Sequence, residues 1–323
     1  MSVPTARSIL SSQHAISGKR IHTILGRIPR IVLAELNTHC VFSRNTASSR
    51  AIPISRMIQN VIDDPFIPLV WGKNQKGMQA TEECNELILV PGAEPFELTD
   101  ARSFTNIEAW LAARDDAVEW ANRFADAGYH KQIVNRLLEP WMWTYVLITS
   151  TQWSNFFALR DHKDAEPHIA MFARAARDAI ENAAVQTLQP GEWHLPFAQA
   201  VGGPGIEDLI KLSVACCAST SYKTVDGFDM TLERAIELHD KLRTAELLHA
   251  SPFEHQAQMD ESYTARVLQT GAKPEFRTQI GPSTFIIENE YSRLETKWRH
   301  PELSGKFAPG FIQYRKTLPN ECR

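Results

Sequence analysis

Residues 38–50 read THCVFSRNTASSR. Within thirteen residues they place one histidine, one asparagine, several hydroxyls and two arginines, with little apolar filler after Phe42. Short hydroxyl donors, backbone N–H groups at a turn and a bidentate guanidinium are what a phosphate group requires. The same composition also suits a polar surface loop in which Asn45 and the serines bond to local backbone. Taken alone, the stretch favours the surface loop.

The segments on either side predict an α+β chain. Residues 31–42 have the apolar spacing of a short helix, which runs into a polar loop over 43–50 and ends before Pro53. Helical spacing predicts further helices at 110–124, 137–148, 169–180, 206–218 and 232–248. Alternation in the last eighty residues, as at 263–267 and 285–287, predicts short strands. We expect a modest antiparallel sheet covered by long helices.

The domain organisation follows from the same pass along the chain. Residues 63–106 hold four prolines and are expected to form a loop-rich insertion. No internal repeat or low-complexity segment divides the sequence. We therefore expect a single catalytic domain over residues 1–323, with an extension of unassigned role at 270–323.

Two further stretches place polar groups beside apolar ones. The first is WSNFFALRDH, residues 153–162, in which Asn155 and Arg160 end a predicted buried helix. They could form hydrogen bonds to the polar edge of a planar ring. Alternatively, the charge of Arg160 could simply interact favourably with the negative end of the helix dipole. The second is HASPFEH, residues 249–255, which follows SVACCASTSY at 213–222. A histidine there could transfer a proton or cap the preceding helix.

Composition narrows the function classes. The net charge of -4 gives no global attraction to phosphate backbones, so a nucleic-acid partner is not expected. Five cysteines without a CxxC pair argue against a disulfide framework or a thiolate zinc site, and no HxxxH or HExxH spacing suggests a metal. Residues 1–20 lack an apolar signal core, and the longest apolar stretch is too short to span a bilayer. A cytoplasmic protein without a membrane partner is expected.

Together, the three stretches resemble the flavin-dependent thymidylate synthases. That family carries an Arg-His-Arg block with trailing Ser, Asn, Glu, Ser and Arg, then a helix with Asn and Leu-Arg, and a Thr-Pro-Phe-Glu-His block. Residues 38–50 match the first block at its spacing, 155–160 match the second, and 251–255 match the third. His249 stands where a family histidine stands, and Arg136, four residues before Pro140, matches a further Arg-to-Pro step.

The order of the blocks differs from that of the family. There the Pro-Phe-Glu-His block precedes the Arg-His-Arg block, whereas here it follows about two hundred residues later. A circular permutation explains this, because termini that are close in space can be rejoined without changing the core. The resemblance covers roughly residues 31–56, 133–182 and 206–260.

Three departures from the family pattern concern its flavin-facing positions. Thr38 and Cys40 replace both arginines of Arg-His-Arg, and Thr46 replaces the glutamate. Residues 149–151 read TST where the family has Asn-x-Arg. The nucleotide-facing arginines Arg50, Arg136 and Arg160 are kept, so the resemblance supports the substrate better than the cofactor.

The resemblance implies a role for each matched residue. The residues implied to bind the nucleotide are Ser48, Ser49, Arg50, Arg136 and Arg160. Arg160 is also expected to be catalytic, because it would stabilise the negative charge that develops at the base edge when C5 of uracil becomes nucleophilic. The residues implied to bind the flavin are His39, Cys40, Asn45, Thr46, Asn155, His249, Ser251 and Glu254. The cysteines Cys40, Cys216 and Cys217 are otherwise expected to be small core residues.

The implied reaction transfers a one-carbon unit, as methyl, from methylenetetrahydrofolate to C5 of dUMP. It requires FAD, with NADPH as reductant. Hydroxymethylation of dUMP, modification of another pyrimidine nucleotide, and a non-catalytic nucleotide-binding protein are the alternatives. The family also implies a homo-oligomer, a tetramer or dimer with shared active sites. The aromatic side chains around residues 141–157 agree with such an interface.

Overall fold

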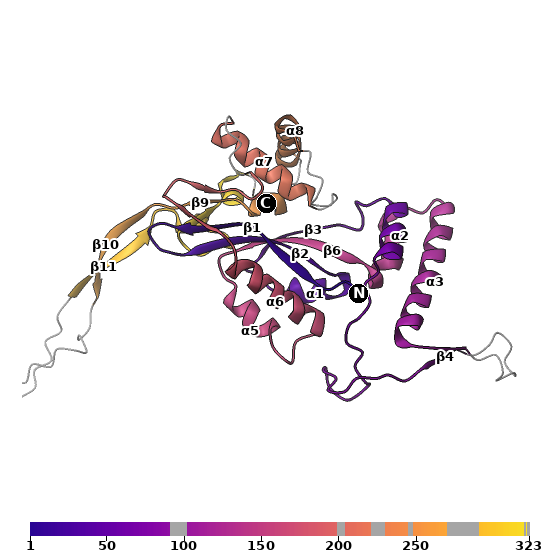
Figure 1. Cartoon of the computed structure of the whole chain (residues 1–323). Coiled ribbons are helices and arrows are strands. Elements are labelled where there is room, and N and C mark those ends of the chain that lie inside the picture. Colours follow the sequence, from indigo (N-terminus) through magenta and orange to yellow (C-terminus); the bar gives the residue numbers. More distant parts are fainter. Residues whose placement is uncertain are drawn as a thin grey trace, which may run out of the picture.

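The computed structural model describes residues 1–90, 102–198, 204–220, 230–244, 248–269, 291–319 and 321. The chain has the α+β fold that the sequence predicts (Figure 1). Its strands are β1 (Thr5–His14), β2 (Arg20–Pro29), β3 (Ser43–Thr46), β4 (Ile88–Val90), β5 (Arg102–Phe104), β6 (Trp143–Ser150), β7 (Val185–Leu188), β8 (Trp193–His194), β9 (Ala257–Met259), β10 (Ser262–Gln269), β11 (Tyr291–Trp298) and β12 (Phe311–Gln313). Its α-helices are α1 (Leu33–Leu36), α2 (Ile54–Asp63), α3 (Asn106–Asp126), α4 (Lys131–Val134), α5 (Ser154–Arg160), α6 (Pro167–Glu181), α7 (Ile206–Ser219) and α8 (Leu232–Thr244).

The central sheet has the strand order β3-β6-β2-β1-β7. Neighbouring strands are antiparallel except β1 and β7, which run parallel. β1 and β2 form a hairpin with Gly18 in its turn at a φ of 67°, a conformation that suits a residue without a Cβ. The expectation of strands in the last eighty residues was therefore incomplete, because residues 5–188 build this sheet.

The two faces of the sheet are covered by different helices. On one face, Ile24, Ile28, Val146 and Ile148 pack against Phe172 of α6 in a buried cluster. On the other face, Leu25 and Leu147 pack against Cys217 of α7. Figure 1 shows α5 and α6 on one side of the sheet and α7 and α8 on the other. Because side chains alternate along a strand, the neighbours Ile24 and Leu25 of β2 point to opposite faces of the sheet.

Gly26 lies in β2 where Phe172 covers the sheet. A Cβ at this position would meet Cε2 of the Phe172 ring at 2.5 Å, so the ring or the strand would have to move. Over-packing of this kind costs about 1–3 kcal/mol. We expect Gly26→Ala to lower the free energy of unfolding by about 2 kcal/mol in a urea titration. Gly205→Ala is the control, because a Cβ there has no neighbour within 4 Å, and equal losses in the two variants would contradict the close approach.

Two local predictions are wrong. Residues 137–148, expected to form a buried helix, are a 3-10 helix over Asn135–Trp141 followed by strand β6. Pro140 ends the helical turn, and β6 is covered on both faces, so it looks apolar all round like a buried helix. Ser43–Thr46, expected to lie in a polar loop, forms edge strand β3. The helical prediction at 31–42 is confirmed only over its first part, where a 3-10 turn (Arg30–Val32) leads into α1.

The predicted helices at 110–124, 169–180 and 206–218 are confirmed as α3, α6 and α7. The helix predicted at 232–248 is confirmed over Leu232–Thr244 as α8, and residues 245–247 lie outside the described part of the chain. The strand predicted at 263–267 is confirmed as part of β10, and residues 285–287 lie outside the described part of the chain. Between α2 and α3, the described residues contain the short β4–β5 pair and an isolated bridge between Gly72 and Glu83, and they are otherwise irregular. Among the described residues, no helix is long and apolar enough to cross a membrane.

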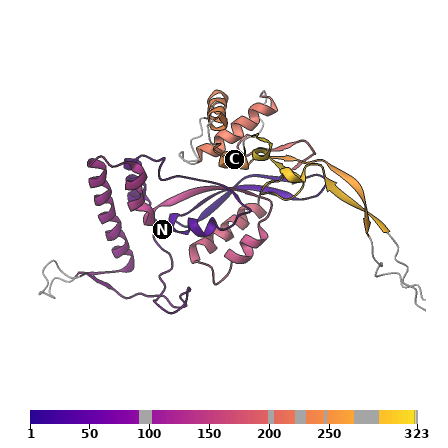
Figure 2. The ribbon, with the colours of Figure 1, turned by 180° about the vertical axis from the view of Figure 1, so that it is seen from behind.

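The C-terminal residues return to the sheet. β10 and β11 form a hairpin that projects from the body, and the chain then comes back to a small sheet of order β12-β9-β8 (Figures 1 and 2). Phe307 and Phe311 are buried against Ile21 of β2. The extension that the sequence left without a role therefore completes the layer that covers the α7 face of the sheet.

Candidate functional site

The first and third sequence blocks meet on this face. Asn45 lies on β3, and Ser251 lies on a 3-10 turn (Ser251–Glu254) that packs against it. The Ser251 hydroxyl donates to Oδ1 of Asn45 at 3.3 Å. The Asn45 amide nitrogen donates to the carbonyl of Cys217 and, at 3.4 Å, to the hydroxyl of Thr220. Two blocks separated by about two hundred residues thus share one buried asparagine.

Glu254 fixes the third block from the other side. Its carboxylate is 4% exposed and forms ion pairs with Lys306 at 2.7 Å and with Arg315. The side-chain amide nitrogen of Gln313 donates to the backbone carbonyl of Glu254 at 2.9 Å and to the hydroxyl of Ser43, on β3, at 3.0 Å. Two positive partners offset the cost of burying the carboxylate. The C-terminal extension therefore holds the 251–255 block against β3.

A chain of buried hydrogen bonds runs beneath this contact. The Thr149 hydroxyl lies 2.8 Å from Nδ1 of His255 and 2.7 Å from the Thr23 hydroxyl. Thr23 in turn lies 2.8 Å from Nε2 of His194, whose Nδ1 lies 2.7 Å from the hydroxyl of Ser12. These residues come from β1, β2, β6, β8 and the third block. The chain ties the central sheet to the layer above it.

The direction of this chain follows from what its ends can do. The amide nitrogen of Gln186 can only donate, and it reaches the Ser12 hydroxyl at 3.0 Å. If each hydroxyl then accepts one bond and donates the next, both histidines are neutral. Burial lowers the pKa of His194 and of His255 to about 3. Nε2 of His255 has no hydrogen-bond partner among the described residues.

Arg160, the predicted catalytic residue, lies at the end of α5 and turns towards the segment after α1. It donates to Nε2 of His39 at 3.1 Å, to Glu35 at 2.8 Å and to Thr38 at 3.3 Å. Burial, and then the positive charges of Arg160 and Arg44, lower the pKa of His39, which agrees with a neutral ring that accepts a bond. The first and second blocks are therefore in direct contact.

Residues around this contact differ in exposure. Asn155 is exposed beside Phe156, whose ring lies 5.0 Å from that of His39. Cys40 is also exposed, so the expectation that it is a core residue is wrong, whereas Cys216 and Cys217 are buried as expected. Burial raises the pKa of the Cys216 thiol to about 11 and raises the pKa of the Cys217 thiol well above its usual range. Neither thiol is suited to act as a nucleophile.

Two of the predicted phosphate residues, Ser49 and Arg136, lie around one carboxylate. Oε1 of Glu139 lies 3.4 Å from the Ser49 hydroxyl, 3.7 Å from Arg136 and 3.5 Å from Arg30. Asn135 holds the following turn by donating to the carbonyl of Ser49 at 2.7 Å. Ser49 and Arg136 are thus brought together.

The remaining predicted residues lie at different depths and positions. Arg50 is exposed on the turn beyond Ser49, and Ser48 and Thr46 are half-buried. His249 is exposed two residues before Ser251. The hydrogen bonds of Arg160 lead to Glu35, Thr38 and His39, away from the Glu139 cluster. The single chain therefore does not gather the three predicted arginines around one cavity of those described here.

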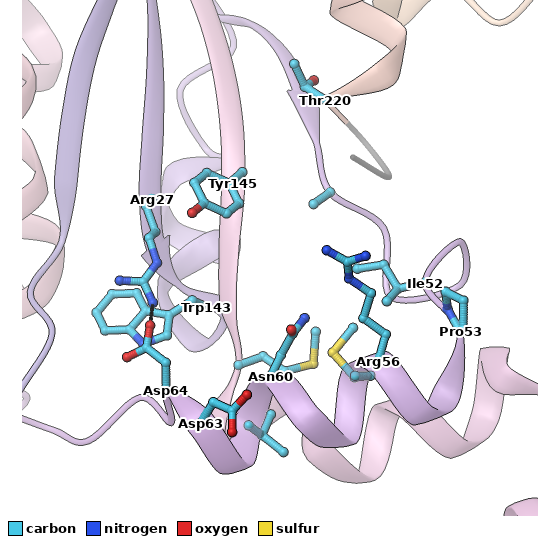
Figure 3. Close-up of a pocket in the computed structure, with 14 residues that line it drawn as sticks. Arg27, Ile52, Pro53, Arg56, Asn60, Asp63, Asp64, Trp143, Tyr145 and Thr220 are labelled. Atoms are coloured by element: carbon cyan, nitrogen blue, oxygen red, sulfur yellow. Dashed lines mark hydrogen bonds and ion pairs between the residues drawn. The ribbon is translucent and has the colours of Figure 1, made fainter. Parts of the chain in front are cut away.

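A pocket of about 320 Å³ opens on the same face, at the end of the sheet that α7 leaves uncovered. Tyr145, Trp143 and Arg27 form its sheet side, and Arg56 of α2 faces them (Figure 3). Met57 of α2 also lines the pocket. Its other lining residues are Ala47, Ile52, Pro53, Asn60, Val61, Asp63, Asp64, Met142 and Thr220. This pocket could not be predicted from the sequence, because its charged and aromatic residues belong to none of the three blocks.

No protein-family model matches the chain, and no curated protein matches it. Among solved structures, the chain is similar to the flavin-dependent thymidylate synthase ThyX from Helicobacter pylori, complexed with FAD and dUMP. The two share 16% sequence identity with a TM-score of 0.32, over 50% of this chain and 67% of that chain. A likeness of this size assigns neither a substrate nor a cofactor.

Proposed function

We propose that the chain is a flavin-dependent enzyme that transfers a one-carbon unit, as methyl, from methylenetetrahydrofolate to C5 of dUMP. The observation that carries the proposal is the contact between Ser251 and Asn45. A circular permutation requires the third block to lie beside the first despite their separation in sequence. Ser251, on the third block, bonds to the asparagine that the resemblance places in the first block.

Arg160 is the proposed catalytic residue. A guanidinium has five N–H donors, and three of the donors of Arg160 are used on His39, Glu35 and Thr38. The remaining donors are available for the O4 edge of a uracil ring. The bond to neutral His39 and the ion pair to Glu35 fix the plane of the guanidinium before substrate arrives, which is how a preorganised donor lowers a barrier.

Ser48, Ser49, Arg50 and Arg136 are the proposed phosphate ligands. Arg136 is 56% exposed and lies 3.7 Å from Glu139, a distance at which the ion pair is weak. A dianionic phosphate can therefore replace Glu139 as its partner at little cost. Arg50 follows Ser49 in the chain, is exposed, and adds a second positive charge.

The residues assigned to FAD fit a flavin only in part within one chain. Asn45, Ser251 and Glu254 are bonded to one another or to neighbouring residues, whereas Cys40, Asn155 and His249 are exposed. When bound, the flavin would supply the hydride that NADPH provides. We propose that a second copy of the chain completes the site, as a homodimer or tetramer. Sedimentation of a stable monomer that still turns over would rule out such sharing.

The mass of the product tests the reaction. The purified protein is incubated with dUMP, methylenetetrahydrofolate, FAD and NADPH, and the nucleotide is analysed by mass spectrometry. A gain of one methyl group supports the proposal, and a gain of one hydroxymethyl group selects the first alternative. If dUMP stays unchanged while another pyrimidine nucleotide gains the carbon, the substrate assignment is wrong.

A non-catalytic nucleotide-binding protein is the second candidate. It is favoured by the internal bonding of Asn45 and Glu254 and by the replacement of two family arginines by Thr38 and Cys40. The two candidates differ in whether they bind flavin, which a fluorescence titration measures. An enzyme that uses FAD quenches flavin fluorescence on titration, whereas a protein that binds dUMP and never quenches flavin is the non-catalytic form.

A further inference from the structure

The pocket beside α2 has an apolar base and an apolar rim. Met57, Val61 and Met142 are almost fully buried in the protein around it, and Ile52 and Pro53 form its rim. Sites of this kind, apolar with a few directed polar groups, are typical of small-molecule binding. At about 320 Å³ the pocket is near the lower end of the usual range of roughly 300–1,000 Å³. It therefore admits one ring system with a substituent and is too small for a dinucleotide.

Charge is distributed unevenly along α2, which forms one wall of the pocket. Arg56 lies in the first turn of this helix, and no side chain caps the helix N-terminus. Asp63 and Asp64 lie at the other end, where Asp64 forms an ion pair with Arg27. The helix dipole adds positive potential at the end that carries Arg56. An anionic ligand group is therefore favoured at the Arg56 end and opposed at the Asp63 end.

The two arginines of the pocket are in different states. Arg27 is neutralised by Asp64, and its guanidinium stacks 4.2 Å from the centre of the Trp143 ring. Arg56 is exposed and makes no hydrogen bond or ion pair within the part of the chain described here. Figure 3 shows its guanidinium extended from α2 towards the open centre of the pocket, with Tyr145 on the opposite side. Arg56 is thus the cation that a ligand can engage.

Tyr145 offers the complementary surface for a ring. Its side chain is half-buried on β6, and its hydroxyl makes no hydrogen bond to any described residue. A planar ring placed between Tyr145 and Met57 would contact an aromatic face on one side and a thioether on the other, both favourable partners for such rings. The phenol and the Asn60 amide could then read polar atoms at the ring edge.

We propose that this pocket binds a planar aromatic anion of mononucleotide size or smaller, with Arg56 as the ligand of its anionic group and Tyr145 and Met57 on either side of its ring. The site goes beyond the proposed function, because none of these residues takes part in it. The pocket nevertheless adjoins the proposed site, since Thr220 both lines the pocket and accepts a hydrogen bond from Asn45.

Two fluorescent probes with one aromatic frame test the assignment on the intact chain. 1-Anilinonaphthalene-8-sulfonate carries an anion, and N-phenyl-1-naphthylamine is its uncharged counterpart. We expect the sulfonate to bind the wild type more tightly than the neutral probe. Arg56→Gln should weaken the sulfonate about tenfold, the loss of one charge-assisted contact, and leave the neutral probe unchanged. Arg234→Gln, which removes another exposed arginine with no ion pair to a described residue, should change neither.

A second variant tests the location independently of charge. Ala47 lines the pocket, and Ala47→Leu fills part of it without altering any charged group. We expect this variant to weaken both probes, with circular dichroism and thermal melting unchanged. The proposal is overturned if Arg56→Gln binds the sulfonate as tightly as the wild type. It is also overturned if folded Ala47→Leu binds both probes normally.

Discussion

Lowering the pH from 7.5 to 5.5 is expected to reduce the free energy of unfolding by about 4 kcal/mol. The cause is three buried neutral histidines. Burial is the main factor that lowers the pKa of His22 to about 4 and those of His194 and His255 to about 3. In the unfolded chain each of these histidines has a pKa near 6.5. Below that pH the unfolded state therefore binds protons that the folded state does not bind.

The sign and the window of this effect follow from the lowered values. The stabilisation is fully present above pH 6.5 and is lost progressively as the pH falls towards 3–4. Each histidine contributes about 1.4 kcal/mol at pH 5.5. Urea titrations at pH 7.5, 6.5 and 5.5 measure the loss, and their slope gives the protons taken up on unfolding.

Single substitutions identify the protons. His22→Asn should reduce the proton uptake by about one, because it removes one of the three neutral rings. His162→Gln is the matched control, since His162 is 53% exposed and should leave the slope unchanged. A free energy of unfolding that stays constant between pH 7.5 and 5.5 would mean that the folded protein does not hold these three histidines neutral.

Arg160→Ala is expected to lower turnover of dUMP by about 10²–10³-fold, the usual cost of removing one preorganised donor at developing charge. The Michaelis constant for dUMP should change much less, because the interaction strengthens only as charge develops on the ring. Steady-state kinetics with a thermal melt of each variant measure both effects. Loss of the bonds to His39 and Glu35 should lower stability only modestly, since Glu35 is 41% exposed.

Arg174→Gln is the control for this substitution. Arg174 lies on α6, is 57% exposed and pairs with Asp161, the residue that follows Arg160. The substitution Arg174→Gln removes an arginine from the same region and leaves the proposed site unchanged, so turnover should stay near that of the wild type. Turnover of Arg160→Ala within about threefold of the wild type would remove Arg160 from the mechanism.

Helices with one apolar stripe could be predicted from the sequence, and β6 shows why the central sheet could not. Its burial on both faces removes the alternation that identifies a strand. β1 fails for a different reason. Ser11 and Ser12 are buried polar residues that bond to histidines, so the strand lacks an apolar face. Tertiary hydrogen bonds, which no local pattern records, replaced hydrophobic contacts there.

The candidate site divides in the same way. The contacts of Asn45 with Ser251, and of His39 with Arg160, involve residues that the block resemblance had already selected. The ion pairs of Glu254 with Lys306 and Arg315 could not be expected, because the extension matched no block. Arg56 and Tyr145 of the pocket lie in different segments, and they line one pocket only because α2 packs against the 3-10 helix that leads into β6.

Release of tritium from dUMP labelled at C5 tests the proposed chemistry most directly. Attachment of a carbon at C5 forms a C–C bond and breaks the C5–H bond, so the proton appears in water whether the product is methylated or hydroxymethylated. With methylenetetrahydrofolate, FAD and NADPH present, we expect the wild type to release tritium in proportion to the nucleotide consumed, and Arg160→Ala to release almost none. A protein that binds labelled dUMP under these conditions and retains all of its tritium would contradict the proposed function.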